Sequence, residues 1–298
     1  MSRVLRIEHT LVLVCALALS GLVMPSLEGC AKQEATAHVG HFATPEDGME
    51  AFVKALREHD REELRNILGP EADSLLESGD EIQAARERET FLHAFDQQHA
   101  LVASGPDAMT LEVGPERWPL PIPIVKRDGG WQFDAAGGAD ELVLRRIGRN
   151  ELAAIDVCYG VVAAQLEYAA DNGRYAAKVI SDPGKRNGLY WETTAGEATS
   201  PAGPLLALAA TEGYEIGKKP TPYHGYYYRS LPASAKDSEG KGFAFVAYPA
   251  EYGASGVMTF LVNQDGVVYQ ADLGEDTAAR AQALDGFSID ATWSPAEI

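Results

Sequence analysis

Hydrophobic residues recur with a helical period in the first part of the chain beyond residue 43. Thr44 followed by Pro45 predicts a helix start, since a threonine side chain can cap the first turn and proline suits the first helical position. The apolar positions Met49, Phe52, Val53 and Leu56 then share one face. A second helix is expected from Asp60 to the stop at Gly69-Pro70, and a more polar third helix over residues 80–99.

The pattern changes to an alternation of period two after residue 107. "AMTLEVG" and "WPLPIPIVKRDGGWQFD" predict strands, joined by a turn at Asp128-Gly129-Gly130. Proline at every second position of the second segment favours an edge strand, because proline cannot donate to a ladder. The apolar set typical of a filled core is Trp118, Leu120, Ile122, Trp131 and Phe133. Helices followed by a curved antiparallel sheet predict a small α+β domain over residues 42–135, similar to the NTF2-like cone.

The stretch "AAGGAD", residues 135–140, predicts a domain boundary. It precedes one helix of roughly 30 residues that ends near Gly173. Its expected buried stripe is Gly148, Leu152, Ile155, Tyr159, Val162, Leu166 and Ala169. The segments "GYYYRSLP", "KGFAFVAYP", "GVMTFLVN" and "GVVYQADLG" predict strands, the last two joined by a hairpin at residues 263–266. Residues 140–298 are therefore expected to form a second α+β domain, a long helix packed on an antiparallel meander.

This second half resembles the head of a type IV pilin or pseudopilin. It departs from that pattern at the front of the long helix, where a pilin needs apolar residues to sit in a membrane. Arg145, Arg146 and Arg149 occupy this part of the helix instead. Assembly into a pilus-like polymer is therefore not expected.

The first thirty residues have the pattern of a targeting segment. Arg3 and Arg6 precede the apolar run of residues 11–24, which is short for a membrane span. Leu27-Glu28-Gly29-Cys30 resembles a bacterial lipobox, although Glu28 departs from it. We expect a signal peptide over residues 1–29, a lipid on Cys30, and a flexible polar tether over residues 30–41. The alternative is ordinary cleavage and a soluble periplasmic protein. No later run is expected to be long and apolar enough to span a membrane.

The net charge of -19 argues against nucleic acid or an anionic lipid surface as a partner, since both attract clustered lysine and arginine. Cysteine occurs three times, at positions 15, 30 and 158. A lipidated Cys30 would leave Cys158 without a partner, so no disulfide framework is expected. Cys158 is predicted to be buried and unreactive.

Known catalytic and metal-binding motifs are incomplete in this chain. "GASGV" has Val257 where a nucleophile elbow needs its second glycine, and "DPGKRNG" lacks the glycine-rich part of a phosphate-binding loop. The histidine pairs 38/41 and 93/99, like the acidic residues 272–276, lack the spacing of metal ligands. No catalytic residue, metal or cofactor is therefore predicted.

The segment "PTPYHGYYYRSLP", residues 220–232, is the main aromatic concentration of the chain. Exposed side chains here would form a recognition surface of Tyr223, His224, Tyr227 and Arg229. The alternative is a structural strand, in which side chains alternate between two faces. Tyr226 and Tyr228 would then pack on the long helix, and Tyr223, Gly225, Tyr227 and Arg229 would face solvent.

Several long motifs resemble one bacterial family, domain of unknown function 2950. They are "TPEDGMEAFVKALREHD", "WPLPIPIVK", "RRIGRNELAAIDVC", "PTPYHGYYYR" and "AYPAEYGASGVMTFLVNQDGVVYQADLG", which lie between residues 42 and 293. The resemblance implies a cell-envelope location and no particular reaction. We therefore expect a membrane-anchored, non-catalytic binding or scaffolding module with an envelope protein or polymer as its partner. The competing hypothesis is a small-ligand-binding or hydrolytic enzyme that uses the cone of the first domain.

Overall fold

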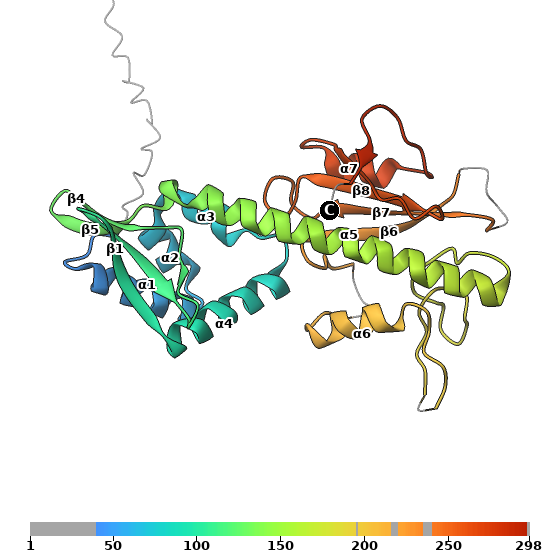
Figure 1. Ribbon diagram of the computed structural model, residues 1–298, viewed down its shortest axis with the longest axis horizontal. Helices are drawn as coiled ribbons and strands as arrows, with labels where there is room; N and C mark the ends of the chain where they lie inside the picture. The colour runs from blue at the N-terminus through green and yellow to red at the C-terminus, as the bar shows by residue number, and fades with distance from the viewer. Residues whose placement is uncertain (1–39, 195, 216–219, 235–239, 297–298) are drawn as a thin grey trace, which may run out of the picture. The chain divides into compact units, whose positions relative to one another are not determined.

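The computed structural model describes residues 40–194, 196–215, 220–234 and 240–296 (Figure 1). The predicted signal peptide and Cys30 lie outside the described residues, as does the tether up to residue 39. Two antiparallel sheets, a long helix and several shorter helices make up the fold, so the predicted α+β class is confirmed.

Four helices open the described chain, three of them where the hydrophobic pattern predicts them. They are α1 (Pro45–Glu58), α2 (Arg61–Leu68), α3 (Ala72–Leu76) and α4 (Glu81–Gln97), with a 3₁₀ turn, η1 (Gly69–Glu71), before α3. The start of α1 is confirmed: the Thr44 hydroxyl accepts from the Asp47 N–H at 3.1 Å, and the Asp47 carboxylate accepts from the Thr44 N–H at 3.1 Å. This reciprocal pair satisfies two N–H groups that the helix itself cannot bond.

The first sheet has the strand order β1-β2-β4-β5, with β3 paired to β2. Its strands are β1 (His99–Gly105), β2 (Ala108–Val113), β3 (Trp118–Pro119), β4 (Ile124–Arg127) and β5 (Gly130–Phe133). The proline-rich segment is therefore not one edge strand but two short strands, β3 and β4. Leu120, Ile122 and Phe133 are buried as predicted, whereas Trp118 is 39% exposed.

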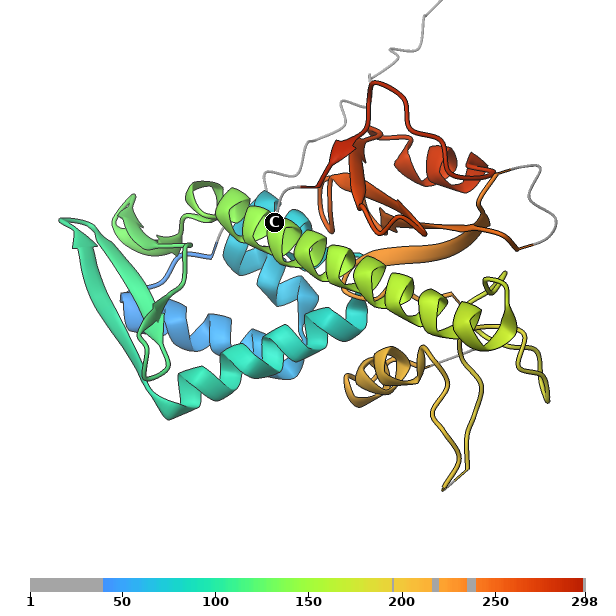
Figure 2. The same ribbon diagram turned by 45° about the vertical axis from the view of Figure 1, so that its right-hand side comes forward.

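A single helix, α5 (Ala139–Asn172), follows a 3₁₀ turn, η2 (Ala135–Gly137). Gly138 lies between them with no room for a side chain, since an added Cβ would sit 2.2 Å from the carbonyl oxygen of Pro121. The early part of α5 contacts α3 (Figures 1 and 2). The predicted domain boundary falls in this stretch and stays a prediction.

The second sheet has the order β10-β9-β8-β7-β6. Its strands are β6 (Tyr226–Pro232), β7 (Phe243–Pro249), β8 (Met258–Asn263), β9 (Tyr269–Asp272) and β10 (Ser294–Pro295), and two helices accompany it, α6 (Gly203–Thr211) and α7 (Thr277–Ala283). The predicted hairpin is confirmed, because Gly266 donates its N–H to the Asn263 carbonyl at 3.0 Å with a φ of 75°. Helix α5 packs on β7 and β8.

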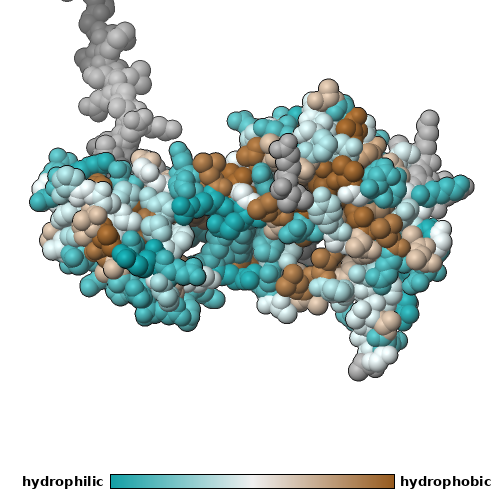
Figure 3. Space-filling model, viewed as in Figure 1, coloured by the Kyte–Doolittle hydropathy of each residue, from teal (hydrophilic) through white to brown (hydrophobic). Residues whose placement is uncertain are grey.

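The predicted buried stripe of α5 is largely wrong. Leu152, Tyr159 and Leu166 are 53%, 39% and 50% exposed. Exposed hydrophobic residues also occur elsewhere, since Figure 3 shows them scattered among hydrophilic ones on one face of the molecule. Ile155 and Val162 of the predicted stripe are buried, and they share the buried face with residues outside the stripe, namely Ile147, Ala154, Cys158, Val161, Gln165 and Tyr168. The small members of this face allow the sheet to approach closely, which periodicity alone could not reveal. By length and composition α5 could also cross a membrane, contrary to expectation, although much of it lies in the core.

The tyrosines of β6 alternate as predicted, but both faces of the strand are covered. Tyr226 is fully buried in the core that includes α5, and Tyr228 packs against that core. Tyr227 packs on the opposite side against a second core, which includes Ala281 of α7. Arg229 donates to the carbonyl oxygens of Ala281, Gln282 and Leu284, at 2.7, 3.2 and 2.9 Å. The prediction of a solvent face is therefore wrong, because the C-terminal segment covers it.

Candidate functional site

A cavity of about 810 Å³ lies among the first four helices, the first sheet and the early part of α5, the elements grouped together in Figure 2. Its apolar lining is Phe52, Leu56, Leu64, Leu68, Leu75, Leu76, Phe91, Ala94, Val113, Trp118, Leu120, Ile122, Leu142 and Ala153. Its polar lining is Gln83, Arg86, Glu87, Thr90, Arg145, Arg146, Arg149 and His224. The predicted core residues Leu120, Ile122 and Phe133 are buried in a hydrophobic cluster, but the interior is not filled throughout, because this cavity remains beside them.

One face each of α4 and α5 supplies the polar residues of this lining, apart from His224. On α4 they are Gln83, Arg86, Glu87 and Thr90, and on α5 they are Arg145, Arg146 and Arg149. Residues three and four apart lie on the same face of a helix, so each set projects toward one side. The cavity thus has apolar walls and two helical faces that carry charge.

Three of the cavity arginines form ion pairs. Arg149 Nη2 lies 2.8 Å from Glu87 Oε1, which links α5 to α4. Arg86 Nη1 lies 3.3 Å from Glu212 Oε2. Arg145 Nε lies 2.8 Å from Glu141 Oε1, and the Arg145 guanidinium stands 5.8 Å from the centre of the Trp118 ring. These side chains are partly exposed, so each pair is weak and can exchange partners.

Arg146 differs from the other three because it is only 5% exposed. Its guanidinium donates to the carbonyl oxygens of Ser74 and Leu75, in the last turn of α3, at 2.8 and 3.4 Å, and to that of Glu77, just after α3, at 3.2 Å. Within the described ranges it forms no ion pair, and its Nε lacks a hydrogen-bond partner. Burial lowers the pKa of Arg146, since removal from water disfavours the charged form.

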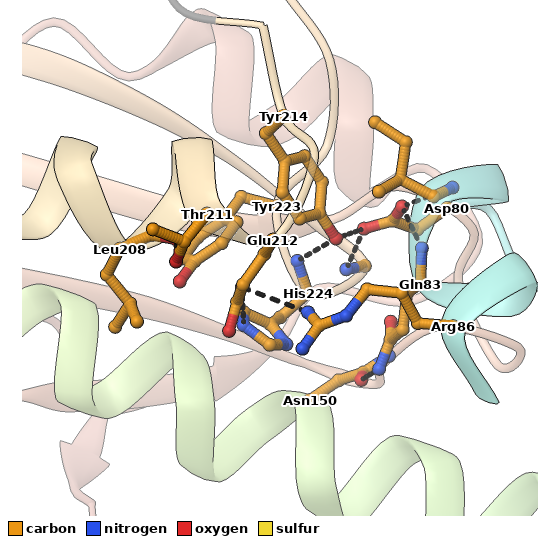
Figure 4. Close-up of polar contacts among 12 residues, drawn as sticks. Asp80, Gln83, Arg86, Asn150, Leu208, Thr211, Glu212, Tyr214, Tyr223 and His224 are labelled. Atoms are coloured by element: carbon orange, nitrogen blue, oxygen red, sulfur yellow. Dashed lines mark hydrogen bonds and ion pairs between the residues drawn. The ribbon is translucent and has the colours of Figure 1, made fainter. Parts of the chain in front are cut away.

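A buried carboxylate, Asp80, organises the polar contacts beside this cavity (Figure 4). Asp80 caps α4, with Oδ1 accepting from the N–H groups of Ile82 at 3.1 Å and Gln83 at 3.0 Å. Its other oxygen, Oδ2, accepts from the Tyr214 hydroxyl at 2.7 Å and from the Gly225 N–H at 3.1 Å. One side chain therefore joins the start of α4 to two segments more than 130 residues further along the chain.

The turn before β6 brings His224 to the cavity. His224 and Gly225 have φ of 50° and 72°, and a Cβ on Gly225 would lie 2.4 Å from Asn150 Nδ2, so only glycine fits there. His224 Nε2 stands 3.0 Å from Glu212 Oε2, the oxygen that Arg86 also approaches. Glu212 thus lies between a cation of α4 and a residue of the turn.

Tyrosines around Asp80 and Glu212 are held in their neutral form. Burial, and then the hydrogen bond to Asp80, raise the pKa of Tyr214 far above its usual value. Burial, and then the nearby Glu212, raise the pKa of Tyr223 to about 12. Near neutral pH both hydroxyls are therefore protonated, and Tyr214 acts as a donor.

Asn150 connects the same region to α5. Gln83 Nε2 donates to Asn150 Oδ1 at 2.7 Å, and Asn150 Nδ2 donates to the Ser255 carbonyl at 2.8 Å. Asn150 is fully buried, and the two bonds satisfy both ends of its amide. Helix α4, helix α5 and the loop before β8 are therefore linked by directional contacts.

The predicted recognition residues do not form a single surface. Tyr223 and His224 lie in the turn, where Tyr223 contacts the rings of Tyr214 and His224. Tyr227 and Arg229 lie on the sheet face that α7 covers. The recognition role stays a prediction, with His224 as the member at the cavity.

Sequence reasoning missed the residues that surround His224. Asp80 could be recognised as a helix cap, but nothing local marked its second role toward Tyr214 and Gly225. Cys158 is buried as predicted, and burial raises the pKa of its thiol to about 12. Among the side chains that the structure describes, no group of three or more potential metal ligands is found.

Comparison with known proteins gives a family and nothing finer. No curated protein matches the chain. The resemblance to a pilin head is not confirmed, and neither is the NTF2-like comparison. The family model described as "Protein of unknown function (DUF2950)" matches residues 40–296, which is most of the sequence. The chain belongs to the DUF2950 family.

Proposed function

We propose that this protein is a membrane-anchored, non-catalytic binding module of the bacterial cell envelope, and that it holds an apolar ligand in the cavity. The cavity itself carries the proposal. Its volume of about 810 Å³ falls within the range of about 300–1,000 Å³ that is typical of small-molecule sites. Its walls are mostly leucine, phenylalanine and other apolar side chains, which favour a ligand with apolar surface.

The polar residues of the lining support binding more than catalysis. Glu87 is held in an ion pair with Arg149. Glu212 could orient His224 as a base, but the described lining residues include no serine, cysteine or lysine for that base to activate. Thr90 donates its hydroxyl to the Arg86 carbonyl at 2.8 Å, within its own helix. An activated nucleophile next to a free base, the usual sign of covalent catalysis, is not found among the described lining residues.

Ligand binding is tested with N-phenylnaphthylamine, a neutral dye whose fluorescence rises in apolar surroundings. The protein should raise the fluorescence in a saturable manner. Ala153→Trp and Thr90→Trp, which add bulk from opposite helices, should abolish binding. Ala163→Trp places the same side chain at an exposed position of α5 and should bind normally. Saturable binding that neither cavity variant alters would contradict the proposal, provided circular dichroism shows that both variants are folded.

The anchor is tested separately. Mass spectrometry of the membrane fraction should find a diacylglycerol-sized addition on an N-terminal Cys30, and Cys30→Ser should release the protein from membranes. An unmodified mature terminus at another residue would leave a soluble periplasmic protein instead. That result would change the location and leave the binding proposal intact.

A further inference from the structure

We infer that the ligand of the cavity is an aliphatic chain that ends in an anionic group, held by the arginines at the cavity. This inference rests on the proposed function and specifies the ligand class. The charge of the cavity lining differs from that of the whole chain. The whole chain carries -19, with 25 lysines and arginines among 298 residues, yet four arginines line this one cavity.

Only three carboxylates pair with these four arginines, and the buried Asp80 beside the cavity accepts from Tyr214 and Gly225 instead. Arg86, Arg145 and Arg149 each pair with one glutamate, namely Glu212, Glu141 and Glu87. Arg146 has no such counterpart within the described ranges and is almost fully buried. The arginines and their carboxylate partners therefore leave one positive charge beside an apolar space, and an anionic head group would balance it.

Arg145 and Arg149 are the best placed to contact such a head group. They lie four residues apart on one face of α5, and their side chains are 39% and 56% exposed. Guanidinium groups present paired N–H donors that match carboxylate and phosphate oxygens. Because their present ion pairs are partly exposed, either arginine can exchange a glutamate for a ligand at little cost.

The overall negative charge does not argue against this ligand. It repels extended anionic surfaces, because these act over distances where the whole protein contributes. A single anion held within a few ångströms of two guanidinium groups responds mainly to its immediate neighbours, since salt screens charges more than about 10 Å away. The net negative charge therefore disfavours extended anionic surfaces, while the arginines of the cavity favour a single small anion as its ligand.

The experiment compares ligands with the same chain and different ends. Dodecanoate, dodecyl phosphate, dodecanol and dodecyltrimethylammonium are used to displace N-phenylnaphthylamine from the whole soluble chain. We expect the anions to bind about tenfold or more tightly than dodecanol, which corresponds to one charge-assisted hydrogen bond. The cation should bind most weakly. Comparison of dodecanoate with dodecyl phosphate distinguishes a carboxylate from a phosphate head group.

Arginine variants locate the selectivity. The double variant Arg145→Gln/Arg149→Gln should reduce the preference for anions to less than about threefold, while dodecanol binding stays within about twofold. Arg186→Gln is the matched control, because Arg186 also pairs with a glutamate, Glu197, and stands 5.4 Å from the centre of a tryptophan ring. It does not line the cavity and should leave the preference unchanged.

The outcomes separate the inference from the proposed function. If dodecanol and the cation bind as well as the anions, the inference is overturned and the apolar site remains. If none of the four ligands displaces the dye and the dye itself does not bind, both are overturned. If the double variant keeps the full preference for anions, the arginines of α5 do not hold the head group and the inference fails.

Discussion

Asp80 makes two separable contributions to stability, and a substitution by asparagine distinguishes them. Its Oδ1 caps α4, and its Oδ2 accepts from Tyr214 and Gly225. Asparagine caps helices about as well as aspartate, so Asp80→Asn should preserve the cap. The amide nitrogen would replace Oδ2 and present donors to the Gly225 N–H, which would lose its acceptor. The cost of this variant therefore reports the link between α4 and the distant turn.

The expected magnitude follows from burial. Asp80 is only 2% exposed, so water cannot easily replace the lost acceptor. A buried donor left without a partner costs about 1–3 kcal/mol, and hydrogen bonds to a charged acceptor are the stronger kind. Loss of the Gly225 bond and weakening of the Tyr214 bond together should lower the free energy of unfolding by about 2–4 kcal/mol. Asp80→Ala also removes the cap and should cost about 1 kcal/mol more.

Urea unfolding followed by circular dichroism measures these free energies, with Asp60→Asn as the matched control. Asp60 also caps a helix, since it accepts from the Glu63 N–H at 2.9 Å, but it is exposed. Asp60→Asn should therefore cost less than about 0.5 kcal/mol. A double-mutant cycle of Asp80→Asn with Tyr214→Phe should give a coupling of about 1 kcal/mol or more. Equal costs for the two caps, with no coupling, would show that Asp80 acts only as a helix cap.

Three further predictions concern the buried tyrosines and the cysteine. Tyr226→Ala should lower the free energy of unfolding by about 3–5 kcal/mol, because Tyr226 is fully buried. Tyr227→Ala should lower it by about 1–2 kcal/mol, because Tyr227 is partly buried against the core that includes α7. If Tyr227→Ala has no effect in urea unfolding, α7 does not cover that face. Cys158, with a thiol pKa of about 12, should resist iodoacetamide at about pH 8 in the folded protein and react once urea unfolds it; rapid labelling of the native protein would contradict its burial. Tyr214 and Tyr223 have raised pKa values in the folded protein, so their full contribution to stability is present when the pH is below about 10, the ordinary pKa of tyrosine. This contribution is lost as the pH rises toward about 12, the pKa of Tyr223 in the folded protein. The urea concentration at the unfolding midpoint should therefore decrease as the pH is raised from about 9 to about 11. A midpoint that stays constant over this range would contradict the burial of these tyrosines.

Secondary structure was predictable where local chemistry decides it. The capping box at Thr44, the glycine end of α5 and the hairpin at residues 263–266 each depend on residues within one turn. The buried side of α5 was not predictable in the same way. The apolar residues Leu152, Tyr159 and Leu166 follow a helical repeat as regular as the buried one, and the side that the sheet covers depends on tertiary contacts.

The candidate site was less predictable because its parts come from distant segments. The stretch 220–232 pointed to His224, but its partner Glu212 and the neighbouring Asp80 carry no local signal of their function. The apolar lining had a clear pattern and was assigned to a filled core. A pattern of apolar residues shows which side of an element is buried and does not show how far apart the opposing elements stand.

The separation of α4 and α5 is where the polar network and the cavity meet. Apolar walls alone favour closure, since side chains that face an empty space lose dispersion contacts. A buried hydrogen bond joins these helices beside the cavity, from Gln83 Nε2 to Asn150 Oδ1 at 2.7 Å, whereas the exposed Glu87–Arg149 pair contributes little. Hydrogen bonds have a narrow range of length, so the Gln83–Asn150 bond sets a spacing that apolar contacts would not keep. Asp80 supports this arrangement from the N-cap of α4, where its Oδ1 accepts from the Gln83 N–H, so buried polar contacts lie beside the space that a ligand would fill.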